Sequence, residues 1–269
     1  MLHGYTQSGP LFRAKTGALA KSLAKSFPLH SVTLSYPTGP LRLNPADVPG
    51  YTPSWNDPLA EETELEAYAW WRRADSSKGD QDAPEYVGLN QGLATVADTL
   101  KEEGPFDGVI GFSQGAAMAF LVASLLEPGR QEAFDAATKS SGNSYSIRFP
   151  VEFNAVNTGN HPPLKFALMY SGFRAPGPRY SAFYENPPLR TPALHVLGTL
   201  DAVVDEARGR QLIDACAGNP GVVFHPGGHF VPSQKTYLDA AVAFVRGCLE
   251  QKNSNEKEEE RVEDMDVPF

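Results

Sequence analysis

Five residues centred on Ser113 read GFSQG and fit the pattern G-x-S-x-G, which can hold a reactive serine in a sharp strand-to-helix turn. The setting matches, because residues 106–111 predict a short strand and the almost wholly apolar residues 114–126 predict a buried helix. Gly111 and Gly115 are small enough for such a turn, and the helix start favours negative charge nearby. The alternative is an ordinary glycine-rich turn with an incidental serine. The context favours Ser113 as a catalytic nucleophile.

A serine hydroxyl needs a neighbouring base to take its proton. In enzymes whose reactive serine sits in such a strand-to-helix turn, the order of the catalytic residues along the chain is Ser, then Asp or Glu, then His. Two histidines follow the last predicted strand, which spans residues 222–225. His229 lies in the turn GGHFVP, where an imidazole can reach over the edge of a sheet. His225 ends the strand itself and fits a structural role better. We therefore predict that His229 is the base.

The acid that orients the histidine should follow the preceding strand, residues 193–198. Asp201 stands in the loop directly after it. Asp205 is the nearby competitor, but it opens a helix, where an acidic residue is explained by capping. We predict that Asp201 orients His229.

Hydrolysis of an acyl group also requires two backbone N–H groups that bind the oxyanion of the tetrahedral intermediate. One donor comes from the residue after the nucleophile, here Gln114. The other usually comes from a loop after an early strand, and the turn HGYT at residues 3–6 offers Tyr5, with Thr6 as the alternative. The two cysteines form no CxxC pair and no cluster at metal spacing, so we expect no metal.

The elements that would position these residues alternate between strands and helices, which is typical of an α/β fold with a mainly parallel sheet and helices on both faces. The predicted strands are residues 31–36, 106–111, 166–171, 193–198 and 222–225. The predicted helices are residues 61–73, 89–103, 114–126, 131–138, 206–217 and 237–249.

Two segments between these elements could cover a substrate. Residues 37–58 contain six prolines and predict a long ordered loop or lid, and residues 128–163 form a polar insertion. Together with Trp70 and Trp71 they could roof an apolar acyl pocket. The alternative, equally open for Trp71, is that the indole rings pack in the core.

The composition of the 269 residues is that of an ordinary globular protein, with 41% hydrophobic and 20% charged residues. Most of the net charge of −9 lies in residues 250–269, so the body lacks the basic face that a nucleic-acid partner requires. We predict a catalytic domain at residues 1–249 and an acidic tail at 250–269 with too little apolar surface to fold by itself. No apolar run is long enough to span a membrane, and no signal peptide precedes the HGYT turn, so a cytoplasmic location is expected.

The chain resembles the fungal and animal family of serine hydrolases (FSH family) over about residues 2–249. The matching segments read LHGYTQSG from residue 2, KTGAL from residue 15, GPFDGVIGFSQGAA from residue 104 and SGF from residue 171, with the turns at 198–201 and 228–229. The resemblance implies an α/β-hydrolase fold and esterase or thioesterase activity without a metal or organic cofactor. The expected partner is a small-molecule ester or thioester, or an acyl chain on a carrier protein, since some fungal relatives release polyketide acyl chains from their synthases.

The sequence departs from this family at its start. Family members have a hydrophobic strand ahead of the His-Gly turn, beside the strand that ends at the nucleophile, and here only Met1 and Leu2 stand in its place. We therefore expect a truncated first strand, a gap in the sheet and a poorly anchored Tyr5, which would be repaired by upstream residues or by other segments. A catalytically impaired, α/β-hydrolase-like binding protein is the alternative from another functional class.

Overall fold

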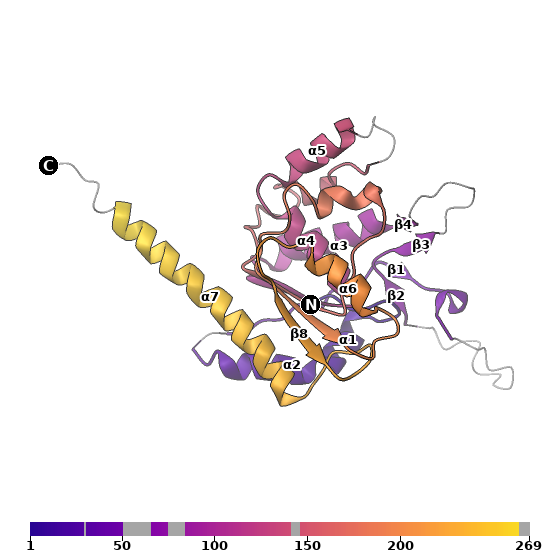
Figure 1. Ribbon diagram of the computed structural model, residues 1–269, viewed down its shortest axis with the longest axis horizontal. Helices are drawn as coiled ribbons and strands as arrows, with labels where there is room; N and C mark the ends of the chain where they lie inside the picture. Colours follow the sequence, from indigo (N-terminus) through magenta and orange to yellow (C-terminus); the bar gives the residue numbers. More distant parts are fainter. Residues whose placement is uncertain (30, 51–65, 75–83, 141–145, 264–269) are drawn as a thin grey trace.

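The computed structural model describes residues 1–29, 31–50, 66–74, 84–140 and 146–263. Within them, a parallel sheet of four strands forms the centre of the molecule (Figure 1). Its order is β5 (Gly108–Phe112), β6 (Phe166–Tyr170), β7 (Ala193–Gly198) and β8 (Gly221–His225). The first three strands are apolar along almost their whole length because helices cover both faces of the sheet.

Two apolar clusters lie on opposite faces of this sheet. Val109 of β5 packs with α3 (Leu89–Glu103), α4 (Gln114–Leu125) and Leu212 of α6 (Glu206–Ile213). The next residue of β5, Ile110, packs with α1 (Gly9–Lys15), α2 (Gly17–Ser26) and α7 (Lys235–Glu263). This alternation is the period of two expected of a strand covered on both faces, and it confirms the predicted layers.

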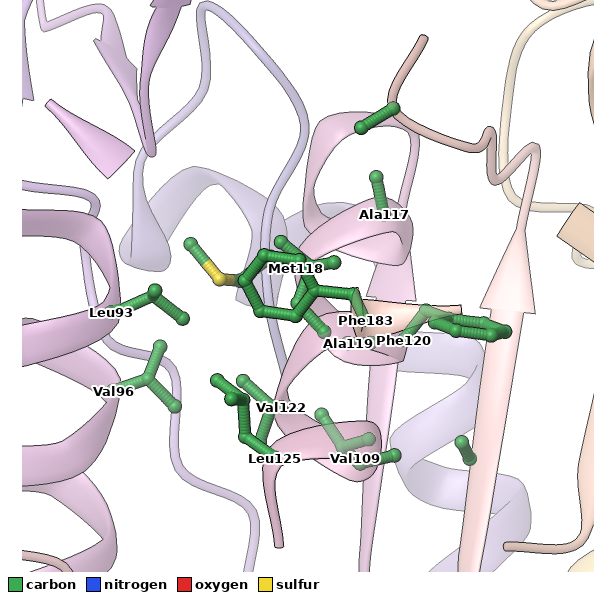
Figure 2. Close-up of a cluster of buried hydrophobic side chains, with 14 of the residues drawn as sticks. Leu93, Val96, Val109, Ala117, Met118, Ala119, Phe120, Val122, Leu125 and Phe183 are labelled. Atoms are coloured by element: carbon green, nitrogen blue, oxygen red, sulfur yellow. The ribbon is translucent and has the colours of Figure 1, made fainter. Parts of the chain in front are cut away.

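Helix α4, which follows Ser113, is buried over its whole length. Figure 2 shows its side chains packed with Leu93 and Val96 of α3 and with Val109 and Phe183 in one apolar cluster. A helix that is apolar all round must be enclosed, so α4 is fixed from every side. The turn that carries Ser113 is therefore held between two buried elements.

The segment ahead of the HGYT turn reaches the sheet through Leu2. Leu2 pairs with Gly111 of β5 in parallel, its N–H donating to the Ile110 carbonyl at 2.8 Å and its carbonyl accepting from the Phe112 N–H at 3.1 Å. The HGYT turn that follows is thereby anchored beside β5, the strand that precedes Ser113. The expectation that Tyr5 would lose its anchor is wrong.

The open part of the sheet lies further along β5, at the end of the strand away from Ser113. A groove with a volume of about 500 Å³ runs there between residues 31–35 and the β5 residues Gly108 and Ile110. Leu249 of α7 lines its apolar wall. Because the groove is at the opposite end of the strand from Ser113, it is separate from the site described below.

Two predictions of secondary structure, one of a strand and one of a helix, are wrong. Residues 31–36 form no strand. Within the described part of the chain, their backbone groups accept one hydrogen bond, from the Met1 amino group to the Ser35 carbonyl at 2.8 Å, and they pair with no other backbone segment. The predicted helix at Glu61–Arg73 lies partly outside the described residues, and residues 66–73 are not helical. They instead include β2 (Tyr68–Ala69) and the start of β3 (Arg72–Ala74), whose backbone groups find partners in other segments.

The remaining elements are short. β1 (Leu41–Arg42) pairs with β2, and β3 pairs with β4 (Glu85–Val87), both antiparallel. The polar insertion contains α5 (Arg130–Ser140), as predicted, and short 3₁₀ helices lie at Pro45–Asp47, Val151–Phe153 and Pro178–Phe183. Helix α7 continues past its predicted end at Leu249 and points away from the body (Figure 1). The division into a domain and an acidic tail stays a prediction.

In the part of the chain that the structure describes, no helix is both long and apolar enough to cross a membrane. Across the same residues, no group of three or more histidine, cysteine or acidic side chains is arranged to hold a metal ion.

Buried histidines give the fold a pH dependence. Burial lowers the pKa of His3 and of His195 to about 4, against about 6.5 for an exposed histidine. Between those two pH values the unfolded chain takes up protons that the folded chain excludes, so stability is full above about pH 6.5 and is lost as the pH falls towards 4. We expect the melting temperature to fall over this range. His195→Gln, which removes one of these groups, should make the fall smaller, and parallel curves for the two proteins would contradict this account.

Candidate active site

Ser113 lies in the turn between β5 and α4, with backbone angles φ 53° and ψ −118°. A non-glycine residue rarely adopts a positive φ, and such strain is typical of functional sites. The turn requires its two glycines. A Cβ on Gly111 would lie 2.1 Å from the Gly115 carbonyl oxygen, and one on Gly115 would lie 2.1 Å from the Leu2 carbonyl oxygen.

His229 reaches Ser113 from the loop after β8. Its Nε2 lies 2.8 Å from the Ser113 Oγ, and its Nδ1 lies 2.8 Å from Oδ2 of Asp201. A carboxylate only accepts hydrogen bonds, so Nδ1 carries the proton and Nε2 is free to accept the serine proton. This is the tautomer that general-base catalysis requires.

Asp201 is held by two kinds of partner. One carboxylate oxygen contacts His229, and the other accepts the N–H groups of Val203 and Val204 at 2.9 and 2.8 Å. Burial by itself raises the pKa of this carboxyl, but the hydrogen bonds from His229 and Val204 outweigh it and lower the pKa below its usual value. Asp201 therefore stays ionised opposite the imidazole.

The two loops that carry the acid and the base are joined to each other. The Leu200 N–H donates to the Gly227 carbonyl at 3.0 Å, and the Thr199 N–H donates to the His225 carbonyl at 2.9 Å. These bonds continue the pairing of β7 with β8 into the loops. The distance from Asp201 to His229 is thus set by the sheet and not by a free loop.

The two competing residues lie elsewhere. His225 is buried at the end of β8, packed against Phe230 and Tyr237, and it makes no hydrogen bond to Ser113 among the described contacts. Asp205 caps the start of α6, where its side chain accepts the Arg208 N–H at 2.9 Å. The capping role expected for Asp205 is confirmed.

The candidate oxyanion donors differ in whether their backbone N–H already donates a hydrogen bond within the protein. The Thr6 N–H donates to the Tyr68 carbonyl at 3.0 Å, and the Gly4 N–H donates to the Gln7 side chain. The Tyr5 N–H has no partner among the described residues, and the Gln114 N–H opens α4, where no carbonyl of its own helix can reach it. These bonds leave Tyr5 and Gln114, rather than Thr6, free to bind an oxyanion.

One contact network was not foreseen from the sequence. The Gln114 side chain accepts the Trp70 N–H and donates to the Trp71 carbonyl, both at 2.9 Å. The two indole rings are buried, and that of Trp71 stacks on Tyr86 with the ring centres 4.8 Å apart. The tryptophans are core residues, and the idea that they roof a pocket is wrong. No local sequence signal reports such long-range contacts.

Apolar side chains are exposed beside the acid and the base, and this too was missed. Leu200 and Val203 flank Asp201 and are 72% and 59% exposed, and Phe230, next to His229, is 43% exposed. We call these three residues the apolar rim.

The geometry is that of a serine hydrolase, and comparison with known proteins agrees with it. Residues 1–241 match the model of a family described as "Serine hydrolase (FSH1)". This chain belongs to the FSH1 serine hydrolase family. The match covers most of the chain, so the resemblance recognised in the sequence is confirmed.

Alignments with several relatives cover most of this serine hydrolase. "Esterase OVCA2" of Danio rerio is 33% identical over 248 residues, which are 91% of this chain and 94% of that protein. "Family of serine hydrolases 2" of Saccharomyces cerevisiae is 29% identical, over 88% of this chain and 92% of that protein. "Dihydrofolate reductase" of Schizosaccharomyces pombe is 35% identical over 88% of this chain, but the chain spans only 44% of that protein.

Solved structures share the fold at low identity. Arabidopsis thaliana SOBER1 aligns with a TM-score of 0.53 at 18% identity, over 92% of this chain and 96% of that one. Esterase PE8 aligns with a TM-score of 0.52 at 19% identity, over 92% and 90% of the two chains. Together with the sheet and its helices, these likenesses confirm the predicted α/β-hydrolase fold of this serine hydrolase.

Proposed function

We propose that this serine hydrolase cleaves carboxylic esters or thioesters through Ser113, with His229 as the base and Asp201 as the orienting acid. The observation that carries the proposal is the unbroken row of hydrogen bonds from the Ser113 hydroxyl through the imidazole to the carboxylate, each 2.8 Å long. It also argues against the alternative of a catalytically impaired binding protein, because that alternative needs no such alignment.

In this mechanism the Ser113 oxygen attacks the carbonyl carbon of the substrate while its proton moves to Nε2 of His229. The negative oxygen of the tetrahedral intermediate accepts the N–H groups of Tyr5 and Gln114, beside the N-terminus of α4. Collapse of the intermediate expels an alcohol or thiol, which takes the proton from His229. Water then releases the acid from the acyl-enzyme by the same steps in reverse. This route uses no metal or organic cofactor.

The apolar rim points to an acyl substrate. Exposed apolar side chains on both loops that flank the triad lose contact with water when a hydrocarbon chain covers them, which contributes about 0.8 kcal/mol for each buried CH₂ group. Acyl esters and acyl thioesters, including an acyl chain on a carrier protein, share this hydrocarbon part. The cytoplasmic location inferred from the sequence stays part of this proposal.

The test is hydrolysis of p-nitrophenyl esters and acyl-coenzyme A thioesters of increasing chain length. We expect kcat/KM to rise with chain length in wild type and the rise to flatten in Leu200→Ser. Leu29→Ser is the matched control, because Leu29 is 91% exposed after α2 and lies in neither segment that could cover a substrate. An equal effect of both substitutions on kcat/KM, or no dependence of kcat/KM on chain length, would contradict the proposed acyl specificity. Absence of any ester or thioester hydrolysis would reject the function itself.

A further inference from the structure

His3, two residues before the candidate oxyanion donor Tyr5, is a fully buried histidine, and both of its ring nitrogens form hydrogen bonds. Its Nε2 lies 2.8 Å from the N–H of Gly39, which can only donate, so Nε2 carries no proton. Burial lowers the pKa of His3 to about 4, and the ring is therefore neutral. In a neutral imidazole the other nitrogen must then carry the hydrogen, and Nδ1 donates it to the Gly4 carbonyl at 2.7 Å.

The carbonyl that accepts this bond belongs to the peptide group whose N–H is that of Tyr5. A peptide group is planar, so a bond that fixes its oxygen also fixes the direction of its N–H. The Gln7 N–H, which donates to the same oxygen at 3.2 Å, holds it from a second direction. A carbonyl that accepts hydrogen bonds also polarises its own amide, which makes the N–H a stronger donor.

His3 is itself held by Trp70, which also contacts Gln114, the other proposed oxyanion donor. The indole Nε1 of Trp70 donates to the His3 carbonyl at 2.8 Å, and the two rings lie 5.0 Å apart. The backbone N–H of the same tryptophan donates to the side chain of Gln114. One buried residue therefore contacts both residues whose N–H groups would bind the oxyanion.

We propose that His3 is a positioning residue of the oxyanion hole, which aims the Tyr5 N–H by holding the Gly4–Tyr5 peptide group through its Nδ1–H. The proposal rests on the proposed function and deepens it. His3 touches neither the substrate nor the reacting atoms. Its effect belongs to the transition state, because negative charge appears on the substrate oxygen only there.

The experiment compares two substitutions of His3 whose side-chain amides each take the place of one of the two ring nitrogens. His3→Asn places an NH₂ group near the position of Nδ1 and can keep the bond to Gly4, whereas His3→Gln places its amide near Nε2 and loses that bond. We expect kcat for a p-nitrophenyl ester to fall about 10- to 100-fold in His3→Gln with little change in KM, somewhat less than the loss of a whole oxyanion donor. His3→Asn should recover most of kcat. Rates are expressed per Ser113 that reacts with a fluorophosphonate, so that unfolded protein is not counted.

Equal kcat losses in the two variants, or a loss that appears only in KM, would overturn the proposal, because a purely structural role does not distinguish the two nitrogens. Should neither variant fold, Trp70→Phe removes the indole N–H that holds the His3 carbonyl, and an unchanged kcat there would also overturn it. A wild-type protein that neither hydrolyses esters nor reacts with the fluorophosphonate would instead reject the proposed function, and the two failures are thus distinguishable.

Discussion

Ser113→Ala should lower the rate of ester hydrolysis by about 10⁴- to 10⁶-fold, the range typical for removal of a triad residue. In the proposed mechanism the substitution deletes the oxygen that His229 activates, and among the described residues no other hydroxyl forms a hydrogen bond with the imidazole. KM should change little, because the backbone of the turn and the apolar rim remain. The measurement is steady-state hydrolysis of a p-nitrophenyl ester, with circular dichroism to show that the fold is intact.

The matched control is Ser124→Ala, in helix α4, which follows Ser113. The Ser124 hydroxyl is buried and donates to the Phe183 carbonyl at 2.6 Å, so its loss should lower the melting temperature and leave kcat close to wild type. If Ser113→Ala kept more than a few per cent of wild-type activity, Ser113 would not be the nucleophile.

His229→Ala should be as damaging as Ser113→Ala, since the three side chains act as one unit. Asp201→Asn should cost about 10⁴-fold, somewhat less, because an amide keeps the shape of the carboxylate but no longer stabilises a protonated imidazole. The measurement is kcat/KM for each variant with the same ester. Both variants should keep the wild-type KM.

The rejected candidates serve as controls for this pair. His225→Ala and Asp205→Asn should change stability and leave kcat near wild type, because one side chain packs against Phe230 and the other caps α6. An active His229→Ala together with an inactive His225→Ala would transfer the role of base to His225.

Much of the candidate site could be predicted because its signals are local. The turn at Ser113 needs glycines two residues before and after it, and both are visible in the sequence. Asp201 follows a buried apolar strand and His229 follows a half-exposed one, and both runs have the composition of strands. Parallel strands bring their carboxyl ends to one edge of the sheet. The helix at Leu89–Glu103 was equally clear from the spacing of its apolar residues, and the helix after Ser113 from its almost wholly apolar sequence.

The errors arose where distant segments decide the structure. Residues 66–73 have apolar side chains at a helical spacing, yet their backbone bonds to the HGYT turn and to the Gln114 side chain favour extended chain. Residues 31–36 have the composition of a strand but face the groove instead of a neighbouring strand. The choice between Tyr5 and Thr6 was likewise open until the partner of the Thr6 N–H was known.

Labelling with a fluorophosphonate tests the central claim most directly, because this reagent forms a covalent bond only with a serine that a neighbouring base activates. The modified residue is located by mass spectrometry of proteolytic fragments. We predict one phosphonate per chain, on Ser113, with labelling abolished in His229→Ala and retained in His225→Ala. A native, folded protein that stays unlabelled, or that carries the label on another residue, would contradict the account.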